Sequence, residues 1–339
     1  MKLFVQIPCL NEEETLPSVI HDIPRYIQGI DEVKVLVIDD GSQDRTAQVA
    51  YMEGADYVLH LPYTQGLARA FSAGINRCLE LGADIIVNTD GDHQYEGKDI
   101  PNLIQPILEG RADIVIGNRQ VTKLAHFSVL KKTLQKLGSR TVGILSSVRV
   151  PDATSGFRAY SREAALRLNV FSKFTYTLET IIQAGKNQIA VAHVPIQANG
   201  PRRQSRLFAN IPTYVKRSIA TILRVYALYE PLRTLFYIGG ILLCIGMVGV
   251  LRFLVFWLIG DGNGHVQSLI ISAILVILGF QVWVVAIVAD LISVNRRLSE
   301  EILYTLKKHI LPLWPEVEVP SGKTPPRPLP ATEKISKVM

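Results

Sequence analysis

The sequence predicts an α/β protein with a Rossmann-like, mostly parallel sheet, followed by a helical hairpin that crosses a membrane. Apolar strand-like runs alternate with helical patterns over residues 1–206, which is typical of a parallel sheet covered by helices. Polar clusters follow these runs, at the carboxyl ends of strands, where ligands bind in such sheets. Two long runs with one charge each lie near the C-terminus, and each is long enough to cross the ~30 Å hydrocarbon core of a bilayer.

Five strands are expected in the N-terminal half, and each is a mainly apolar segment. The first is KLFVQIPCL at residues 2–10, and VKVLVIDD at residues 33–40 is apolar enough to be buried on both faces. DYVLHL at 56–61, ADIIVNTD at 83–90 and ADIVIGN at 112–118 follow the same plan. Their order along the chain predicts an open sheet with one binding edge.

Helical patterns separate the strands. The glutamates at 12–14 suit the first turn of a helix, where negative charge is favoured. Further helices are expected over 42–55 and 66–83. No GxGxxG follows the first strand, and no GxxxxGK[ST] occurs anywhere in the chain, so a dehydrogenase or a P-loop enzyme is disfavoured.

The two C-terminal runs predict an antiparallel membrane hairpin. Residues 235–259 contain one charge, Arg252, and residues 266–292 contain one, Asp290. The short link 260–265 has no Lys or Arg, while basic residues flank the outer ends, so the positive-inside rule places the N-terminal domain and both termini in the cytoplasm. Arg252 either snorkels to the far interface or has a function. Two buried helices of a soluble core are the alternative to a hairpin in lipid.

Composition excludes several classes of protein. Of the 339 residues 48% are hydrophobic and only 19% are charged, against about 25% charged in soluble domains. The net charge of +6 is too small and too scattered for a dedicated nucleic-acid binder, so no nucleic acid is expected, but it suits a protein beside anionic lipid. The three cysteines share no metal spacing, which disfavours a disulfide framework and a zinc site. No signal peptide is expected, because the chain runs directly into an apolar strand.

Two acidic motifs carry the expected chemistry. Asp90 and Asp92 flank Gly91 at the end of a strand, which suits a hard divalent cation shared with phosphates. A solvated turn is the alternative for such a pair. The acidic residues in DDGSQDRT, at 39–46, can accept hydrogen bonds from ribose hydroxyls or a base edge, and they also suit the N-cap of the next helix.

Five motifs together resemble the family 2 inverting glycosyltransferases of GT-A fold, and among them the dolichyl- or polyprenyl-phosphate sugar synthases. They are IPCLNEE, VIDDGSQDRT, NTDGDHQY, IGNR and DATSGFRAY, in the family's order. The expected organisation is a GT-A domain at 1–206, amphipathic interfacial helices at 207–233, two transmembrane helices at 234–295, and a cytoplasmic helix with a disordered tail at 296–339.

The resemblance implies a site for a nucleotide-sugar donor, a polyprenyl or dolichyl phosphate acceptor and a Mg²⁺ or Mn²⁺ ion, beside the lipid bilayer. The metal ligands would be Asp90, Asp92 and Gln94 of DGDHQ, where the family usually has DADLQ. Asp92, Arg119 and Arg202 are the expected catalytic residues. The expected substrate-binding residues are Pro8, Leu10, Asn11, Glu12, Asp39, Asp40, Asp90, Lys131, Lys132, Ser155, Arg158, Glu179, Arg203 and Arg206. Lys131 and Lys132 are alternatives for the acceptor phosphate, and Glu179 either contacts the sugar or is structural.

The implied reaction moves a sugar from a GDP- or UDP-linked donor to the lipid phosphate, with inversion. A phosphate monoester has a second pKa of about 6 and is already anionic, so no strong general base is required. Members that act on sugar hydroxyls commonly show a Glu-Asp pair late in the domain, whereas Glu179 is followed by Thr180. Asp152 is a residual candidate base with a loop-structural role as its alternative. A transferase acting on a glycolipid hydroxyl and a non-catalytic membrane scaffold are the competing functions, and a homo-oligomer stays open.

Overall fold

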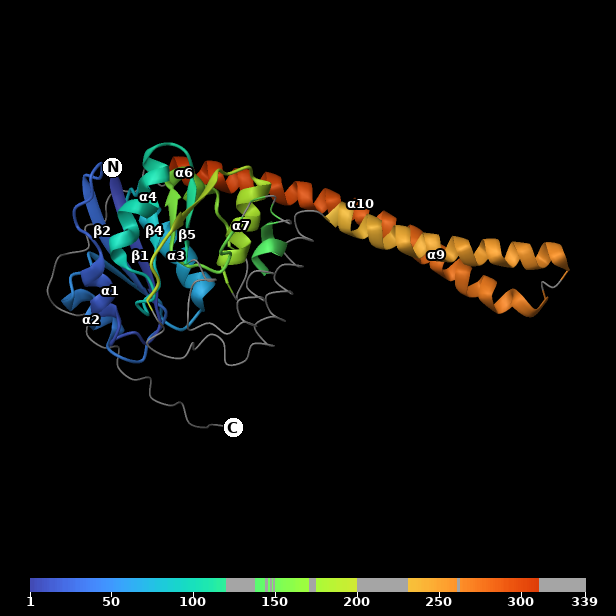
Figure 1. Cartoon of the computed structure of the whole chain (residues 1–339), viewed down its shortest axis with the longest axis horizontal. Coiled ribbons are helices and arrows are strands. Elements are labelled where there is room, and N and C mark those ends of the chain that lie inside the picture. The colour runs from blue at the N-terminus through green and yellow to red at the C-terminus, as the bar shows by residue number, and fades with distance from the viewer. Residues whose placement is uncertain are drawn as a thin grey trace, which may run out of the picture.

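The computed structural model describes residues 1–119, 138–143, 146, 148, 150–170, 175–199, 231–260 and 263–310 (Figure 1). Its N-terminal half is built on one seven-stranded sheet with the strand order β3-β2-β1-β4-β6-β5-β7. The strands are β1 (Lys2–Cys9), β2 (Glu32–Asp39), β3 (Tyr57–His60), β4 (Ile85–Asn88), β5 (Ile114–Asn118), β6 (Arg158–Ser161) and β7 (Val191–Pro195). Among these strands only β6 runs antiparallel to its neighbours, so the predicted, mostly parallel sheet is confirmed.

Helices cover both faces of this sheet. They are α1 (Leu16–Asp22), α2 (Thr46–Met52), α3 (Leu67–Glu80), α4 (Ile100–Leu108), α6 (Arg162–Arg167) and α7 (Thr177–Lys186), with a 3₁₀ turn η1 (Gly97–Asp99) before α4. Alternate residues of each strand point to opposite faces. Phe4 and Leu36 therefore pack with α3, α6 and α7 in one core, and Leu3 and Val35 pack with α1 and α4 in the other. Two buried faces explain why the strands are apolar runs without polar alternation.

The first helix begins later than the glutamates at 12–14 predicted. α1 starts at Leu16, with Pro17 in its first turn, where the fixed φ of proline is favourable. The preceding turn is held by other contacts, because the backbone N–H of Glu12 donates to Thr46 Oγ1 at 2.8 Å. The glutamates thus lie in the loop at the carboxyl edge of the sheet.

Two long helices form the C-terminal hairpin. They are α9 (Pro231–Ile259) and α10 (Val266–Ile310), joined through the 3₁₀ turn η3 (Asn263–His265), and both are long and apolar enough to cross a membrane. Large apolar side chains are exposed along both, with Ile241 at 60% and Ile277 at 57%. Such a surface is unfavourable in water and favourable in lipid, which argues against buried helices of a soluble core.

Small residues let the two helices approach closely. A Cβ atom added to Gly279 would lie 2.7 Å from Leu243 Cγ and 2.9 Å from the carbonyl oxygen of Gly239. Close backbone contact at small residues is typical of helix pairs in membranes. Nearer the tip, Arg252 lies over the ring of Phe256, 5.5 Å from its centroid and one turn closer to the link.

Candidate active site

The carboxylates that follow β4 lie at the carboxyl edge of the sheet. β4 is buried along its whole length, so the chain leaves the core after it and turns at Gly91. Gln94 closes this turn around Asp92: its backbone N–H donates to Oδ1 at 3.2 Å and its side-chain amide to Oδ2 at 2.8 Å. The DGDHQ motif therefore forms one compact loop, in which Gln94 orients Asp92.

A neighbouring loop packs directly against Asp90. A Cβ atom added to Gly156 would lie 2.8 Å from both carboxylate oxygens of Asp90, so only glycine leaves room for this carboxylate. The backbone N–H of Gly156 donates to the hydroxyl of Tyr95 at 3.0 Å, and its carbonyl accepts from the side-chain amide of Asn88 at 2.9 Å. Gly156 is thus held on both sides while it supports Asp90.

His93 ties the same loop to the rest of the domain. Its backbone is left-handed, with φ 58°, and its Nε2 lies 2.7 Å from Asp22 Oδ2 at the end of α1. On the other side, the backbone N–H of Asn199 donates to the carbonyl of Gln94 at 3.0 Å. The histidine that replaces the usual leucine of DADLQ therefore anchors the loop to α1.

The electrostatics of the loop fit a divalent cation. Burial, together with the charge of Asp92, raises the pKa of Asp90 to about 7, and no hydrogen bond from a described residue reaches the Asp90 carboxylate. Even half-buried, a carboxylate with no hydrogen-bond donor and a second carboxylate beside it is unfavourable unless a cation offsets its charge. The described residues contain no cluster of three or more acidic, histidine or cysteine ligands. Asp90, Asp92 and the side-chain oxygen of Gln94 would therefore hold Mg²⁺ or Mn²⁺ jointly with phosphate oxygens, as Mg²⁺ commonly requires.

The loops after β1 and β4 meet at this edge. The hydroxyl of Thr15 lies 2.7 Å from the carbonyl oxygen of Gly91 and 3.0 Å from Glu12 Oε2. Asn11 has a left-handed backbone, with φ 54°, and its N–H donates to Ser42 Oγ at 2.9 Å. These contacts join the segments expected to bind the nucleotide to the Asp90–Asp92 loop.

Asp39 and Asp40 are engaged within the protein. The carboxylate of Asp40 accepts from the backbone N–H groups of Gln65 and Gly66 at 2.7 and 2.8 Å, and Asp39 Oδ2 lies 2.8 Å from His60 Nδ1. Asp39 is 1% and Asp40 3% exposed. Both carboxylates hold the loops that follow β2 and β3, and the nucleoside contact expected of them stays a prediction.

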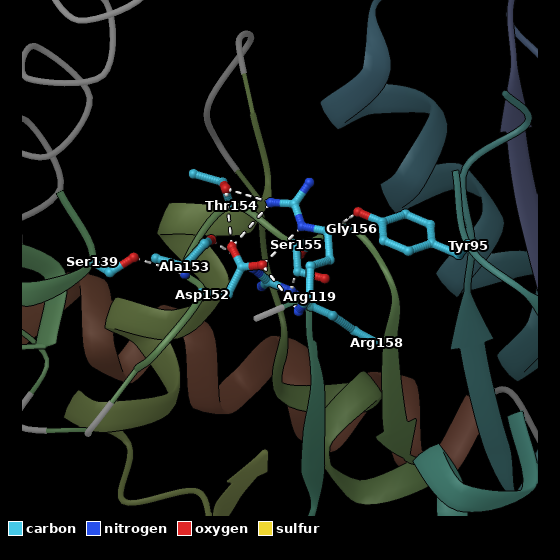
Figure 2. Close-up of polar contacts among 9 residues, drawn as sticks. All are labelled: Tyr95, Arg119, Ser139, Asp152, Ala153, Thr154, Ser155, Gly156 and Arg158. Carbon is cyan, nitrogen blue, oxygen red and sulfur yellow. Dashed lines mark hydrogen bonds and ion pairs between the residues drawn. The ribbon is translucent and has the colours of Figure 1, made fainter. Parts of the chain in front are cut away.

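Arg119, directly after β5, forms a buried ion pair with Asp152 (Figure 2). Arg119 Nε donates to Asp152 Oδ2 at 2.8 Å, and Nη2 donates to Oδ1 at 3.0 Å and to Thr154 Oγ1 at 2.8 Å. Burial alone would raise the pKa of Asp152, but the Arg119 charge and the hydrogen bonds from Arg119 and Thr154 outweigh it and lower that pKa. Asp152 is thereby a counter-ion in the loop, and Figure 2 shows the second terminal nitrogen of Arg119 pointing away from it.

Arg158 has an internal role in place of the expected substrate contact. It is fully buried, and it donates to the carbonyls of Ser155, Ala153 and Thr177 and to Thr180 Oγ1, at 2.8 to 2.9 Å. These bonds set the shape of the loop that supports Asp90. Ser155 is also fully buried, and its hydroxyl has no partner among the described residues.

The remaining expected residues separate into two groups. Glu179 is 1% exposed and accepts from Gln183 at 3.4 Å, which favours the structural alternative. Lys131, Lys132, Arg202, Arg203 and Arg206 lie outside the described residues, so their roles stay predictions.

The structure brings most of the predicted site together. Pro8, Leu10, Asn11, Glu12, Asp39, Asp40, Asp90, Asp92, Gln94, Arg119 and Ser155 lie in or next to the loops at the carboxyl edge of the sheet. Tyr95, Asp22 and Thr15 were not expected there. Of these three residues, only Tyr95 could have been predicted from the sequence, because it directly follows DGDHQ. The contacts of Asp22 and Thr15 depend on how α1 packs.

Comparison with known proteins agrees with this geometry. Residues 4–168 match the family model described as glycosyl transferase family 2. Polyprenol monophosphomannose synthase from Mycolicibacterium smegmatis is 30% identical over 206 residues, which cover 58% of this chain and 76% of that protein. Dolichyl-phosphate hexose transferase from Haloferax volcanii is 30% identical over 194 residues, which cover 57% of this chain and 81% of that protein.

A solved structure shares the fold. Glucosyl-3-phosphoglycerate synthase from Mycobacterium tuberculosis, in complex with Mn²⁺, UDP-glucose and phosphoglyceric acid, superposes with a TM-score of 0.53 at 25% identity. The match covers 67% of this chain and 80% of that chain. The predicted GT-A class is therefore confirmed, and with these relatives the chain belongs to glycosyl transferase family 2 as a hexosyltransferase.

Proposed function

We propose that this glycosyltransferase moves a sugar from a GDP- or UDP-linked donor to a polyprenyl or dolichyl phosphate, with inversion at the anomeric carbon. Relatives named as polyprenol-phosphate and dolichyl-phosphate sugar transferases support this substrate class. The apolar hairpin supports it as well, because it would hold the enzyme in the bilayer that contains the acceptor.

The pairing of Asp152 with Arg119 carries the choice of acceptor. A hydroxyl acceptor needs a carboxylate that can take its proton. Asp152 is a poor base for this step, because both of its oxygens accept hydrogen bonds from the Arg119 side chain and its pKa is lowered. A phosphate acceptor is already largely anionic at neutral pH, so alignment and charge neutralisation are the main tasks that the protein must perform.

The residues at the edge of the sheet divide these tasks. Asp90, Asp92 and Gln94 would hold Mg²⁺ or Mn²⁺, which when bound supplies positive charge for the departing diphosphate. Arg119 would use its second terminal nitrogen for a charge-assisted hydrogen bond to a phosphate oxygen. Arg202, Arg203 and Arg206 would add further cations near the phosphates, and Lys131 or Lys132 would bind the acceptor phosphate. These roles follow the resemblance of the motifs.

The proposed organisation follows the predicted boundaries. The GT-A domain at 1–206 and both termini lie in the cytoplasm, residues 207–233 lie at the interface, and the spans lie within 234–295, which leaves 296–339 in the cytoplasm. This orientation is supported by the basic residues at the outer ends of the hairpin. The link 260–265 contains no Lys or Arg.

A transfer assay tests the proposal. The full-length protein in detergent is given GDP-mannose, UDP-glucose or UDP-N-acetylglucosamine with Mg²⁺ or Mn²⁺, and either undecaprenyl phosphate or a glycolipid with a free hydroxyl. We expect an inverted product with the lipid phosphate alone. Product with the glycolipid alone would replace this function by hydroxyl transfer, and no product with any donor would leave a non-catalytic scaffold.

A further inference from the structure

The last third of α10 leaves the hairpin and lies along the catalytic domain (Figure 1). α10 has 45 residues and α9 has 29, which correspond to about 67 Å and about 43 Å of helix. Residues 280–310 contain no Gly or Pro, the residues at which helices usually kink. An uninterrupted helix therefore runs from the apolar span into the charged residues 295–310.

Tyr304 makes the central contact of this segment with α6. Its side chain is 8% exposed although it lies on a helix outside the main domain. Its hydroxyl donates to Glu163 Oε1 at 2.7 Å, and the guanidinium of Arg167 lies over its ring, 4.2 Å from the centroid. Lys308 donates to the same hydroxyl oxygen at 3.0 Å. One aromatic side chain thus joins two oppositely charged residues of α6.

Contacts on both sides of Tyr304 extend the docking. Lys307 Nζ donates to Asn169 Oδ1 at 3.4 Å, and Glu301 Oε2 lies 3.9 Å from Arg167 Nη1. Within α10, Arg296 pairs with Glu300 at 2.9 Å one turn apart, which stabilises the helix where it leaves the span. The docking contacts therefore extend over about two turns of α10, from Glu301 to Lys307.

The surface that receives α10 is fixed to the sheet, at the edge opposite the site. Ser161 caps α6 by accepting from the backbone of Ala164 at 3.1 Å, and Arg162 donates to the carbonyl of Ala83 at 2.9 Å. β6 directly precedes α6 and begins at Arg158, whose bonds shape the loop under Asp90. The four residues of β6, about 13 Å, connect this loop to the docking surface across the sheet, since Ser161 at the end of β6 pairs with Ile85 at the start of β4.

We propose that residues 295–310 are a rigid strut that sets the height and orientation of the active site above the bilayer, with Tyr304 as its positioning residue. The inference rests on the proposed function, since only an acceptor anchored in the membrane has a fixed height. A nucleotide-sugar and a water-soluble acceptor can diffuse to the site at any orientation. A lipid phosphate held in the headgroup region cannot follow a domain that tilts away.

The test compares two acceptors with the full-length protein in phosphatidylglycerol–phosphatidylethanolamine vesicles. One acceptor is undecaprenyl phosphate in the vesicle, and the other is the short, water-soluble citronellyl phosphate. Tyr304→Phe removes the hydroxyl and Tyr304→Ala removes the ring. The matched control is Ile302→Ala, because Ile302 lies on the same stretch of α10 and is 61% exposed.

We expect Tyr304→Ala to lower kcat/KM for undecaprenyl phosphate at least about tenfold and to change that for citronellyl phosphate less than about twofold. With undecaprenyl phosphate, the kcat/KM of Tyr304→Phe should lie between those of Tyr304→Ala and the unsubstituted protein. The kcat/KM of Ile302→Ala should equal that of the unsubstituted protein. Equal losses with both acceptors would make Tyr304 merely structural and overturn the proposal, as would no loss with either.

Hydrogen–deuterium exchange gives a readout independent of activity. Tyr304→Ala should speed exchange in residues 295–310 and in α6, and Ile302→Ala should not. If the unsubstituted protein acts on neither acceptor, the proposed function fails, and exchange alone then decides whether the strut is docked. Unchanged exchange in Tyr304→Ala would overturn the docking itself.

Discussion

Replacing Asp90 by asparagine should stabilise the protein while it abolishes activity. Burial and the adjacent charge of Asp92 raise the pKa of Asp90 from 3.8 to about 7. The ionised form of Asp90 is therefore less stable in the folded protein than in the unfolded chain. Asparagine has nearly the same shape and cannot ionise, so it removes this penalty together with the charge needed to bind a cation.

The magnitude follows from the size of the shift. A difference of about 3 pKa units corresponds to about 4 kcal/mol at 1.36 kcal/mol per unit. Asp90 is half-buried rather than fully buried, so solvent screening reduces the gain to about 2 kcal/mol. For a domain of this size that corresponds to a rise in Tm of about 4–8 °C.

The sign depends on pH. Because the folded pKa lies above the unfolded one, the penalty is absent below about pH 3.8, grows as the pH rises, and is complete above about pH 7. The Tm of Asp90→Asn should therefore exceed that of the unsubstituted protein most at pH 8 and less at pH 5. Mn²⁺ with UDP or GDP should raise the Tm of the unsubstituted protein only.

Differential scanning fluorimetry in detergent at pH 5 and pH 8 measures these differences. Glu14→Gln is the matched control, because Glu14 is exposed near the same edge and its replacement should leave the Tm unchanged. A lower Tm for Asp90→Asn at pH 8, or a difference independent of pH, would show that the Asp90 carboxylate carries no burial penalty.

Three further changes test other parts of the site and the hairpin. Gly156→Ala brings a methyl group to within 2.8 Å of the Asp90 carboxylate. We expect this substitution to lower kcat at least about tenfold while the protein still folds. Retained activity would show that this loop can move. Asp152→Asn keeps the shape of the side chain but removes the charge that pairs with Arg119. The unpaired Arg119 cation should destabilise the fold by about 3 kcal/mol, which is measured as a lower Tm. An unchanged Tm would refute the buried pair. Gly279→Ile places a branched side chain at a close contact between α9 and α10 and should reduce the yield of folded protein on size-exclusion chromatography in detergent. A normal profile would mean that the helices pack differently.

Local pattern was sufficient for the elements of the fold. Each strand was visible as an apolar run because both faces of a parallel sheet are buried, and β2 and β4 appeared where residues 33–40 and 83–90 predicted. The start of α1 was mispredicted, since Glu12 satisfies its backbone through Thr46, a residue 34 positions away. The acidic residues 12–14 suit the first turn of a helix, but the hydrogen bonds that decide where the helix begins come from residues distant in sequence.

What the sequence by itself determined is the family and the position of the Asp90–Asp92 pair at the carboxyl end of a buried strand, because these depend on residue types next to one another in the chain. Only the tertiary structure decided which side chains are free to act. It used Asp39, Asp40 and Arg158 to hold loops, paired Asp152 with Arg119, and brought Tyr304 of α10 onto α6, 141 residues away. The physical reason is that burial and hydrogen-bond partners come from segments distant in sequence, and no local pattern records which of them will meet.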